Sequence, residues 1–421
     1  MQTDKENRAW KFSAPGRTEL AGNHTDHNNG KVLAAAINLE ITASVQKTYD
    51  NTIFFCSCGF PDVKVKLTDE KGNPDLLPKP EETGKTEALI RGIAAEFFKR
   101  GCKVSGFSAN AESAVLPGSG LSSSAAVEVL IGRIFDSLFA DGKHSAVEIA
   151  QIGQIAENVY FGKPCGLMDQ IACANGGAVF IDFADTHNPI VKKINFDPAA
   201  FGYTLCIVNT GGSHADLTAD YASIPEEMKS AAAFFGKSVL RELDKETLLS
   251  RASDIRKKLG DRALLRSIHF FDENARVDAL FSLLLEMDNT GKTASLNSVN
   301  QNAFRRYLEL INESGISSAE LLQNVYSPND PGTQGISAAL TLTKDFLRKY
   351  KPSSGSELKN SYSSACYGAY RVHGGGFAGT IQAYIPTDAM EAYRAFMETV
   401  FGAGCVTPLK INYNGAAELN K

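Results

Sequence analysis

The sequence lacks an excess of basic residues and lacks long apolar runs, and each absence excludes a class of partner. It has 43 Lys and Arg against 48 Asp and Glu, a formal net charge of −5, so we expect no basic surface for nucleic acid. It contains no run of about 18 apolar residues, the length that a membrane-spanning helix needs. The first ten residues, MQTDKENRAW, have no apolar core, so we expect no signal peptide.

Clustered cysteines are also missing. The eight cysteines are scattered along the chain, and only Cys56 and Cys58 lie close together. No second pair or histidine cluster accompanies them, as a structural zinc site would require. We therefore expect free thiols in a protein of the reducing cytoplasm.

The most informative stretch that is present is LPGSGLSSSAA, at residues 116–126. Its glycines let the backbone come close to a ligand, and an apolar run of helix-forming length follows. Free N–H groups at a helix N-terminus attract phosphate. No Gly-Lys-Ser/Thr follows, so the loop is not a Walker A motif, and the glycine spacing is not that of a Rossmann fold. A phosphate cradle and a plain turn with a serine N-cap both fit this stretch taken alone.

The length of 421 residues predicts two domains. Strand and helix patterns alternate up to Asn209, and the segment from 215 to about 287 is mostly helical and rich in charge. We predict an α+β protein whose domains span residues 1–210 and 211–421, with the active site in the cleft between them. The predicted strands cover 32–37, 41–45, 52–57, 63–67, 104–109, 177–182, 203–209, 369–372, 380–385 and 406–413. The predicted helices cover 86–100, 125–139, 145–160, 304–314, 337–350 and 388–401.

Three further stretches accompany this loop. They are APGRTELAGNHTDHNNG at 14–30, CGLMDQ at 165–170 and RVHGGGFAG at 371–379. In this order the four stretches resemble the signatures of the GHMP kinases, and the first and CGLMDQ resemble those of the galactokinases. The resemblance covers most of the chain. It implies a ribosomal-S5-like N-terminal domain, a ferredoxin-like C-terminal domain, and ATP-dependent phosphorylation of the anomeric hydroxyl of a sugar, above all galactose. A monomer is expected.

The resemblance also implies the catalytic residues. Asp169 corresponds to the base that receives the proton of the sugar hydroxyl, and Arg17 to the cation beside it. Mg²⁺ requires oxygen ligands, which the resemblance assigns to Ser124 and Glu157. The residues implied in ATP binding are Ser57, Gly118, Ser119, Gly120, Leu121, Ser122, Ser123 and Ser124.

A sugar ring is recognised by short polar side chains. The resemblance assigns this role to Asn23, His24, Thr25, Asp26, Gly166 and Tyr221. Galactokinases usually carry Glu where Asn23 stands, so the sequence predicts weaker galactose binding and a relaxed tolerance at C6, because a charged hydrogen bond is lost. The motif at 373–379 is expected to hold the nucleotide and sugar loops against the C-terminal domain.

Two alternatives stay open from the sequence. A related sugar-1-kinase could act on galacturonate, arabinose or N-acetylgalactosamine. A galactose sensor without catalysis, as known among galactokinase relatives, would carry a disrupted Ser-Ala step in the phosphate loop. Here Ser124-Ala125 is intact, which favours the enzyme.

Overall fold

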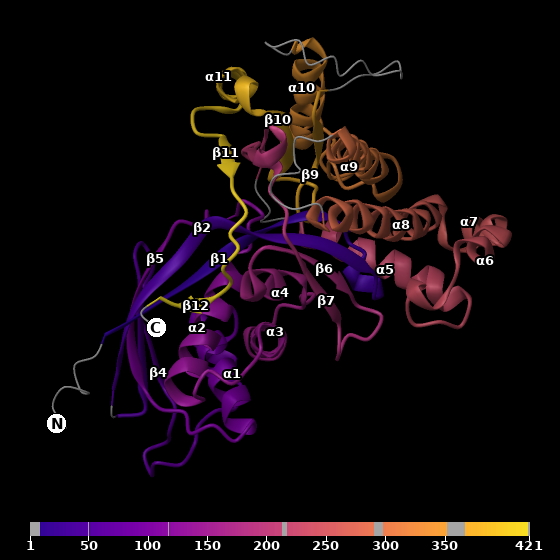
Figure 1. The fold of residues 1–421 in the computed structure, drawn as a ribbon. Helices are drawn as coiled ribbons and strands as arrows, with labels where there is room; N and C mark the ends of the chain where they lie inside the picture. Colours follow the sequence, from indigo (N-terminus) through magenta and orange to yellow (C-terminus); the bar gives the residue numbers. More distant parts are fainter. Residues whose placement is uncertain are drawn as a thin grey trace.

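The computed structural model describes residues 9–48, 50–116, 118–212, 217–289, 298–351 and 367–419. Its strands form two sheets, and helices cover one face of the first sheet and surround the second (Figure 1). None of the helices in these described ranges is long and apolar enough to cross a membrane.

The first sheet has eight strands in the order β12-β1-β2-β5-β3-β4, with β6 on β2 and β7 on β6. Its centre is the long pair β1 and β2, which is antiparallel and carries bulges after Pro15 and Glu19. These bulges re-aim the side chains of β1 at the end of the strand that leads to the peptide at 22–30. The strands are β1 Trp10–Ala21, β2 Lys31–Lys47, β3 Thr52–Ser57, β4 Val63–Lys66, β5 Phe107–Ser113, β6 Ala178–Asp182, β7 Ile190–Ile194 and β12 Ala417–Glu418.

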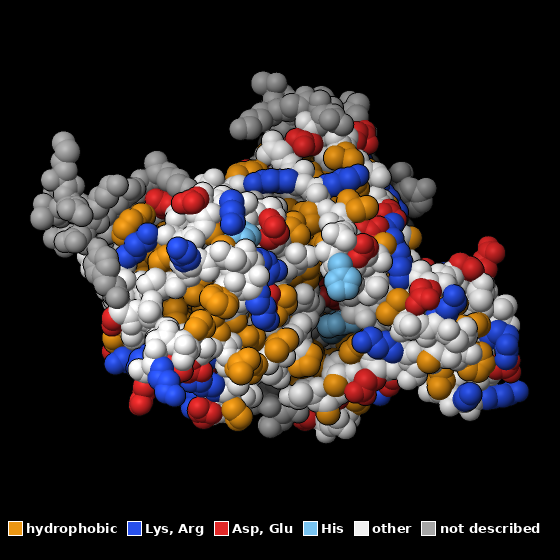
Figure 2. Space-filling view, turned by 90° about the horizontal axis from the view of Figure 1, so that it is seen from below, with side chains coloured by type: hydrophobic (Ala, Val, Ile, Leu, Met, Phe, Trp, Pro, Cys, Tyr) orange, Lys and Arg blue, Asp and Glu red, His pale blue; other side chains and the backbone are white. Residues whose placement is uncertain are grey.

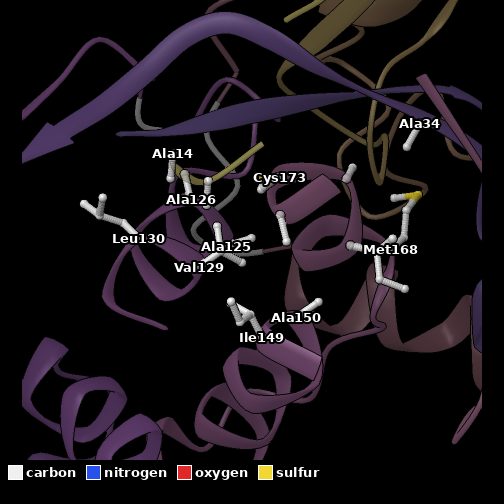
Figure 3. Close-up of a cluster of buried hydrophobic side chains, with 14 of the residues drawn as sticks. Ala14, Ala34, Ala125, Ala126, Val129, Leu130, Ile149, Ala150, Met168 and Cys173 are labelled. Carbon is white, nitrogen blue, oxygen red and sulfur yellow. The ribbon is translucent and has the colours of Figure 1, made fainter. Parts of the chain in front are cut away.

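Helices α1 Thr86–Lys99, α2 Ser123–Phe139, α3 Ala146–Ile155 and α4 Met168–Asn175 cover one face of this sheet. Small side chains where α2 meets α4, including Ala125, Ala126 and Cys173, are almost fully buried. Larger ones from α2 and α3, such as Val129 and Ile149, complete the cluster (Figure 3). Close packing of this kind leaves little freedom, so it fixes the start of α2 relative to the start of α4.

The second sheet has the strand order β11-β8-β10-β9, all antiparallel. Its strands are β8 Tyr203–Asn209, β9 Ala369–Val372, β10 Thr380–Pro386 and β11 Val406–Leu409. The helices of the second half are α5 Thr218–Phe234, α6 Lys245–Ser250, α7 Ala252–Leu259, α8 Asp261–Asn289, α9 Ser298–Ser317, α10 Gly335–Lys349 and α11 Met390–Phe401. Helix α8 runs beside α9 and reaches β2 of the first sheet (Figure 1).

Most predicted elements are confirmed, and the differences have physical causes. Residues 32–37 and 41–45 form one strand, β2, because both its ends are held by neighbouring strands. The predicted strand 104–109 begins three residues later and ends four residues later, as β5. The predicted helix 145–160 begins with the expected capping box at Ser145 and Glu148 but ends at Ile155 and continues as a π-helix, Ala156–Phe161.

Strand β1 was missed because its polar, glycine-containing sequence does not alternate. The hydrogen-bonded sheets also divide the chain differently from a cut at residue 210, since β8 lies in the second sheet and β12 returns to the first. The division into 1–210 and 211–421 stays a prediction. The seven cysteines in the described ranges form no disulfide; Cys366 lies outside them.

Figure 2 views the molecule from below, where acidic and basic side chains are interspersed. This face therefore carries no area of a single charge.

Candidate functional site

The serine loop joins β5 to α2. Gly118 and Gly120 have positive φ, at 69° and 71°, and so does Ser122, at 56°. Helix α2 begins at Ser123, two residues before the predicted start, and Ser122 gives it no side-chain cap. The N-cap alternative for Ser122 is thereby excluded. The first N–H groups of α2 are left to other partners, which is the condition for anion binding at a helix N-terminus.

Two side chains of this loop have structural contacts instead of facing a ligand. The Ser119 hydroxyl donates to the Leu116 carbonyl at 2.6 Å. Leu121 is fully buried in the core. These residues would therefore contact a phosphate only through their backbone.

Asp169 stands in the first turn of α4 and is held by two partners. Arg17 donates to it through two parallel bonds, from Nε to Oδ1 at 2.7 Å and from Nη2 to Oδ2 at 2.8 Å. The Ser122 hydroxyl donates to Oδ2 as well. Arg17 also donates from Nη1 to the Gly120 carbonyl, so a single guanidinium links the predicted base to the serine loop.

These contacts control the charge of Asp169. Burial raises the pKa of its carboxyl group, but the charge and hydrogen bonds of Arg17 and the Ser122 hydroxyl outweigh burial, so the pKa lies below its usual value. The pKa of Arg17 is raised: its burial lowers it, and Asp169 more than compensates. Asp169 is therefore ionised at neutral pH and can accept a proton or a hydrogen bond.

A cavity of about 270 Å³ opens beside this pair. Its wall combines acidic groups, cations and glycine backbone from both halves of the chain, as the recognition of a small polar molecule requires. The lining residues are Arg17, Glu19, Asn23, His24, Asp26, His27, Lys163, Pro164, Cys165, Gly166, Met168, Asp169, Tyr221, Gly374 and Gly375.

The peptide after β1 contributes His24 and Asp26 to this wall. His24 Nε2 pairs with the Gly375 carbonyl at 2.9 Å, and burial lowers the pKa of His24 to about 3. The imidazole is therefore neutral, and its Nδ1 is buried without a hydrogen-bond partner among the described residues. A Cβ on Gly166 would lie 2.2 Å from Asp26 Oδ2, so glycine is required there for the carboxylate to keep its place.

Thr25 is brought near the cavity but does not line it. Its hydroxyl donates to the carbonyls of Gly22, at 2.9 Å, and Lys31, at 2.6 Å, and the residue is fully buried. These contacts stabilise the turn between Gly22 and Lys31.

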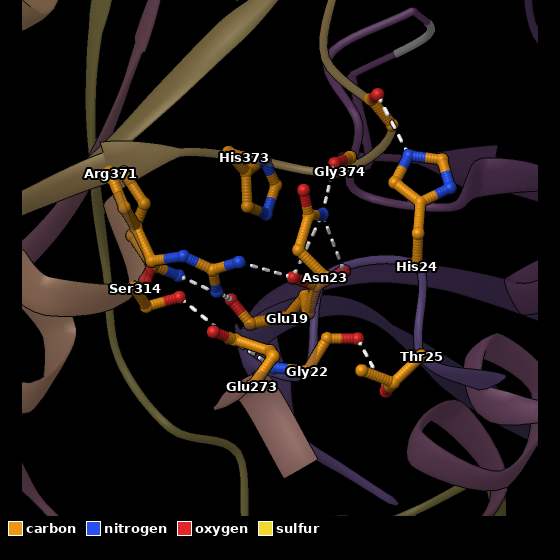
Figure 4. A network of polar contacts seen from close by, with 12 residues as sticks. Glu19, Gly22, Asn23, His24, Thr25, Glu273, Ser314, Arg371, His373 and Gly374 are labelled. Carbon is orange, nitrogen blue, oxygen red and sulfur yellow. Dashed lines mark hydrogen bonds and ion pairs between the residues drawn. The ribbon is translucent and has the colours of Figure 1, made fainter. Parts of the chain in front are cut away.

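Asn23 lines the cavity, yet its amide is bonded to protein (Figure 4). Its Nδ2 donates to the Gly374 carbonyl at 2.7 Å and faces both oxygens of Glu19 at 3.2 and 3.4 Å. Its Oδ1 accepts from Asn324 Nδ2 at 2.8 Å.

The motif at 373–379 joins the two halves of the site. His373 pairs with the hydroxyls of Thr18 and Thr380, each at 3.0 Å, and Thr380 donates to the Ser119 carbonyl at 3.1 Å. Tyr221 lines the cavity, and its hydroxyl donates to the Gly376 carbonyl at 2.9 Å. This linking role of the motif was expected from the sequence.

The two candidate magnesium ligands lie on different elements. Ser124 is in the first turn of α2, and Glu157 is buried in the π-helix. Gln170 Nε2 donates to Glu157 Oε2 at 3.0 Å and to Oε2 of a second buried carboxyl, Glu128, at 2.9 Å. Lys163 pairs with Glu157 Oε1 at 3.2 Å. Within the part of the chain that the structure describes, Glu128 Oε1 is buried without a hydrogen-bond partner.

Ser57 lies apart from this cavity. It lines a second one, of about 610 Å³, together with residues of β1, β2 and β5, such as Thr42 and Asn110. Its assignment to the adenine side stays a prediction.

Sequence reasoning missed four charged residues of the site: Glu19, Glu128, Lys163 and Glu273. Glu19 follows Arg17 by two positions on a strand, the spacing of one face, and Glu128 follows Ser124 by four on a helix. These spacings were available signals. No local signal marks Glu273 of α8, which accepts from the Gly22 N–H at 3.0 Å and from Ser314 at 2.6 Å.

Two protein-family models match the parts of the sequence that contain most residues of this site. The family model of the GHMP kinases N terminal domain matches residues 88–177, and the galactokinase galactose-binding signature matches residues 3–47. The galactokinase of Streptomyces coelicolor is 32% identical over 296 residues, which are 68% of this chain and 71% of that protein. The galactokinase of Glaesserella parasuis is 34% identical over 266 residues, 63% of this chain and 66% of that protein. The chain thus matches about two thirds of the length of these relatives.

Solved structures show the same fold. Lactococcus lactis galactokinase complexed with galactose superposes with a TM-score of 0.74 at 22% identity, covering 98% of this chain and 96% of that one. Methanococcus jannaschii mevalonate kinase superposes with a TM-score of 0.61 at 12% identity, covering 96% and 99%. The fold is therefore the two-domain α+β fold of the GHMP kinases, and by its sequence the chain belongs to the galactokinase family.

Proposed function

We propose that this protein transfers the γ-phosphoryl group of ATP to the anomeric hydroxyl of galactose, forming galactose 1-phosphate. The observation that carries the proposal is the bidentate Arg17–Asp169 pair, which lies between the serine loop and a polar cavity. Phosphoryl transfer requires a phosphate cradle, a positioned acceptor hydroxyl and a group that takes its proton. We propose that the serine loop, the polar cavity and Asp169 supply these three parts.

Asp169 is proposed to accept the hydrogen bond, and finally the proton, of the anomeric hydroxyl. Its low pKa, which Arg17 and Ser122 maintain against burial, keeps it ionised for this role. Arg17 is also placed to offset negative charge on the transferring group. His24, Asp26, Gly166 and Tyr221, which line the cavity, are proposed to hold the sugar.

The nucleotide is proposed to bind with its phosphates on residues 118–124 and with Mg²⁺. Ser124 and Glu157 fit the ion, because both offer oxygen, the ligand atom that Mg²⁺ prefers. The buried Glu128 Oε1, one turn after Ser124, accepts no hydrogen bond from any residue in the described ranges. The bound ion would supply positive charge to the phosphate oxygens.

The test is to incubate the protein with ATP and a panel of free sugars and to measure sugar 1-phosphate. We expect galactose to be the best substrate, and Asp169→Asn to lower kcat by at least about 10²-fold while folding and ATP binding persist. Near-normal turnover of that variant would contradict the assignment of the base. A protein that binds ATP and galactose without product would instead be a sensor.

We further propose that the protein works as a monomer in the cytoplasm. Light scattering of the purified protein tests the first point, and fractionation of the source cells tests the second.

A further inference from the structure

The site has no carboxylate at Asn23, but it has one four residues earlier, on Glu19. Glu19 stands near the end of β1, is 3% exposed and lines the cavity beside Asp169. Its carboxylate lies within 3.2–3.4 Å of Asn23 Nδ2. The two side chains therefore occupy adjoining places in the same wall (Figure 4).

The side-chain amide of Asn23 is hydrogen-bonded to other protein groups. Both of its N–H donors face acceptors, the Gly374 carbonyl and Glu19, and its oxygen faces the donor Asn324 Nδ2. A reversed amide would set oxygen against oxygen at Gly374 and Glu19, so the partners fix its orientation. Three of its four hydrogen-bonding positions are thus filled.

Glu19 retains an open acceptor. Its Oε1 accepts from Arg371 Nη2 at 2.5 Å and from Asn23 at 3.2 Å. Its Oε2 has only the 3.4 Å contact with Asn23 among the described residues, although a carboxylate offers about four lone-pair sites. Burial raises the pKa of the Glu19 carboxyl, and the charge and hydrogen bond of Arg371, fully buried on β9, oppose this rise.

We propose that Glu19 is a sugar-binding residue, whose Oε2 accepts a hydrogen bond from a hydroxyl of the sugar other than the one phosphorylated, while Asn23 positions it. This inference rests on the proposed function. It replaces the expectation drawn from Asn23 alone, because the site keeps a carboxylate at the sugar. It predicts strict recognition of one hydroxyl, and a galacturonate carboxylate near Glu19 would be repelled by the Glu19 carboxylate.

The test compares galactose with its 2-, 3-, 4- and 6-deoxy derivatives. We expect wild type to lose about tenfold or more in kcat/KM with one of them, because a hydrogen bond to a charged group is lost. In Glu19→Gln that penalty should shrink to about threefold or less, and the penalties for the other derivatives should not change. For galactose, KM should rise about tenfold and kcat should change little, because Glu19 does not touch the reacting atoms.

Glu19→Gln leaves the buried Arg371 without its counter-charge, so it can fail to fold. Glu19→Asp keeps the charge but withdraws the oxygens by one methylene group, and it should show the same loss of selectivity in a folded protein. Asn23→Glu would put a second carboxylate against Glu19 and the Gly374 carbonyl, so we expect it to weaken galactose binding. Improved galactose binding in this variant would contradict the inference.

A structure of the wild-type protein with bound galactose tests the proposal without any substitution. A Glu19 oxygen within hydrogen-bond distance of a sugar hydroxyl is expected, and a sugar with no hydroxyl near Glu19 would overturn the proposal. Calorimetry of galactose binding separates this inference from the proposed function. Binding that depends on Glu19 without formation of sugar 1-phosphate would support the first and refute the second.

Discussion

The hydroxyl of Ser122 donates its hydrogen bond to Asp169 rather than to the helix that it precedes. A serine at the start of a helix usually caps it. Here the backbone of Ser122 is left-handed, and the side chain turns toward the carboxylate of α4. The Ser122 side chain thus links the serine loop to the proposed base, Asp169, instead of capping helix α2.

Removing this hydroxyl should change the pH dependence of the reaction. Ser122 lowers the pKa of Asp169, and activity requires the ionised carboxylate, so activity is present above that pKa and is lost as the pH falls through it. Ser122→Ala should therefore move the acid limb of kcat/KM to higher pH. No helix cap is lost, so any loss of stability comes from the missing hydrogen bond to Asp169 alone. Ser282→Ala, which removes an exposed hydroxyl from α8, is the control, and an unmoved acid limb in Ser122→Ala would contradict the coupling.

Ser124→Ala and Glu157→Ala test the proposed magnesium site. Each removes one oxygen ligand, so each variant should need more Mg²⁺ for its half-maximal rate. The measurement is the rate as a function of Mg²⁺ at constant ATP. Glu286→Ala, which removes an exposed carboxylate of α8, should titrate like wild type. If all variants titrate alike, the ion binds elsewhere.

Gly166→Ala tests the position of Asp26. The added Cβ would lie 2.2 Å from Asp26 Oδ2, so the carboxylate must move out of the cavity wall. We expect the KM for galactose to rise by about tenfold or more, as for the loss of a charged hydrogen bond, while the KM for ATP changes little. At Gly332 the nearest atom to an added Cβ is 3.6 Å away, so Gly332→Ala is the matched control. An unchanged galactose KM in Gly166→Ala would show that Asp26 does not contact the sugar.

Glu128→Gln tests the buried carboxyl pair. Burial, and then the charge of Glu157, raise the pKa of Glu128 well above its usual value. A raised pKa favours the protonated form in the folded protein, so the stability of wild type falls as the pH rises through that pKa. Gln mimics the protonated acid and cannot ionise. The free energy of unfolding should therefore decrease less with pH in the variant, as measured by urea titration at several pH values, and parallel curves would contradict a protonated Glu128.

The sequence predicted the parts of this site that are local and failed on those that depend on tertiary packing. The serine loop, the CGLMDQ segment and the capping box at Ser145 are short motifs whose chemistry is visible in a few residues. The contact of Glu19 with Arg371 joins residues 352 positions apart in the chain, so no local pattern reveals it. The same holds for Glu273, on a helix whose polar residues look solvent-exposed in the sequence. Strand β1 was missed because its buried polar side chains interrupt the expected alternation.

The path of the chain between the two sheets has a consequence for its synthesis. Strand β1, which carries Arg17 and Glu19, has β2 on one side and β12 on the other, with Phe12 opposite Glu418. The segment from β11 to β12 runs from the second sheet back to this edge (Figure 1). During translation β12 is made after every strand of the second sheet. Until then β1 has no partner on that edge. The edge of the strand that bears Arg17 stays unpaired throughout that interval, and an unpaired strand edge is where misassembly begins.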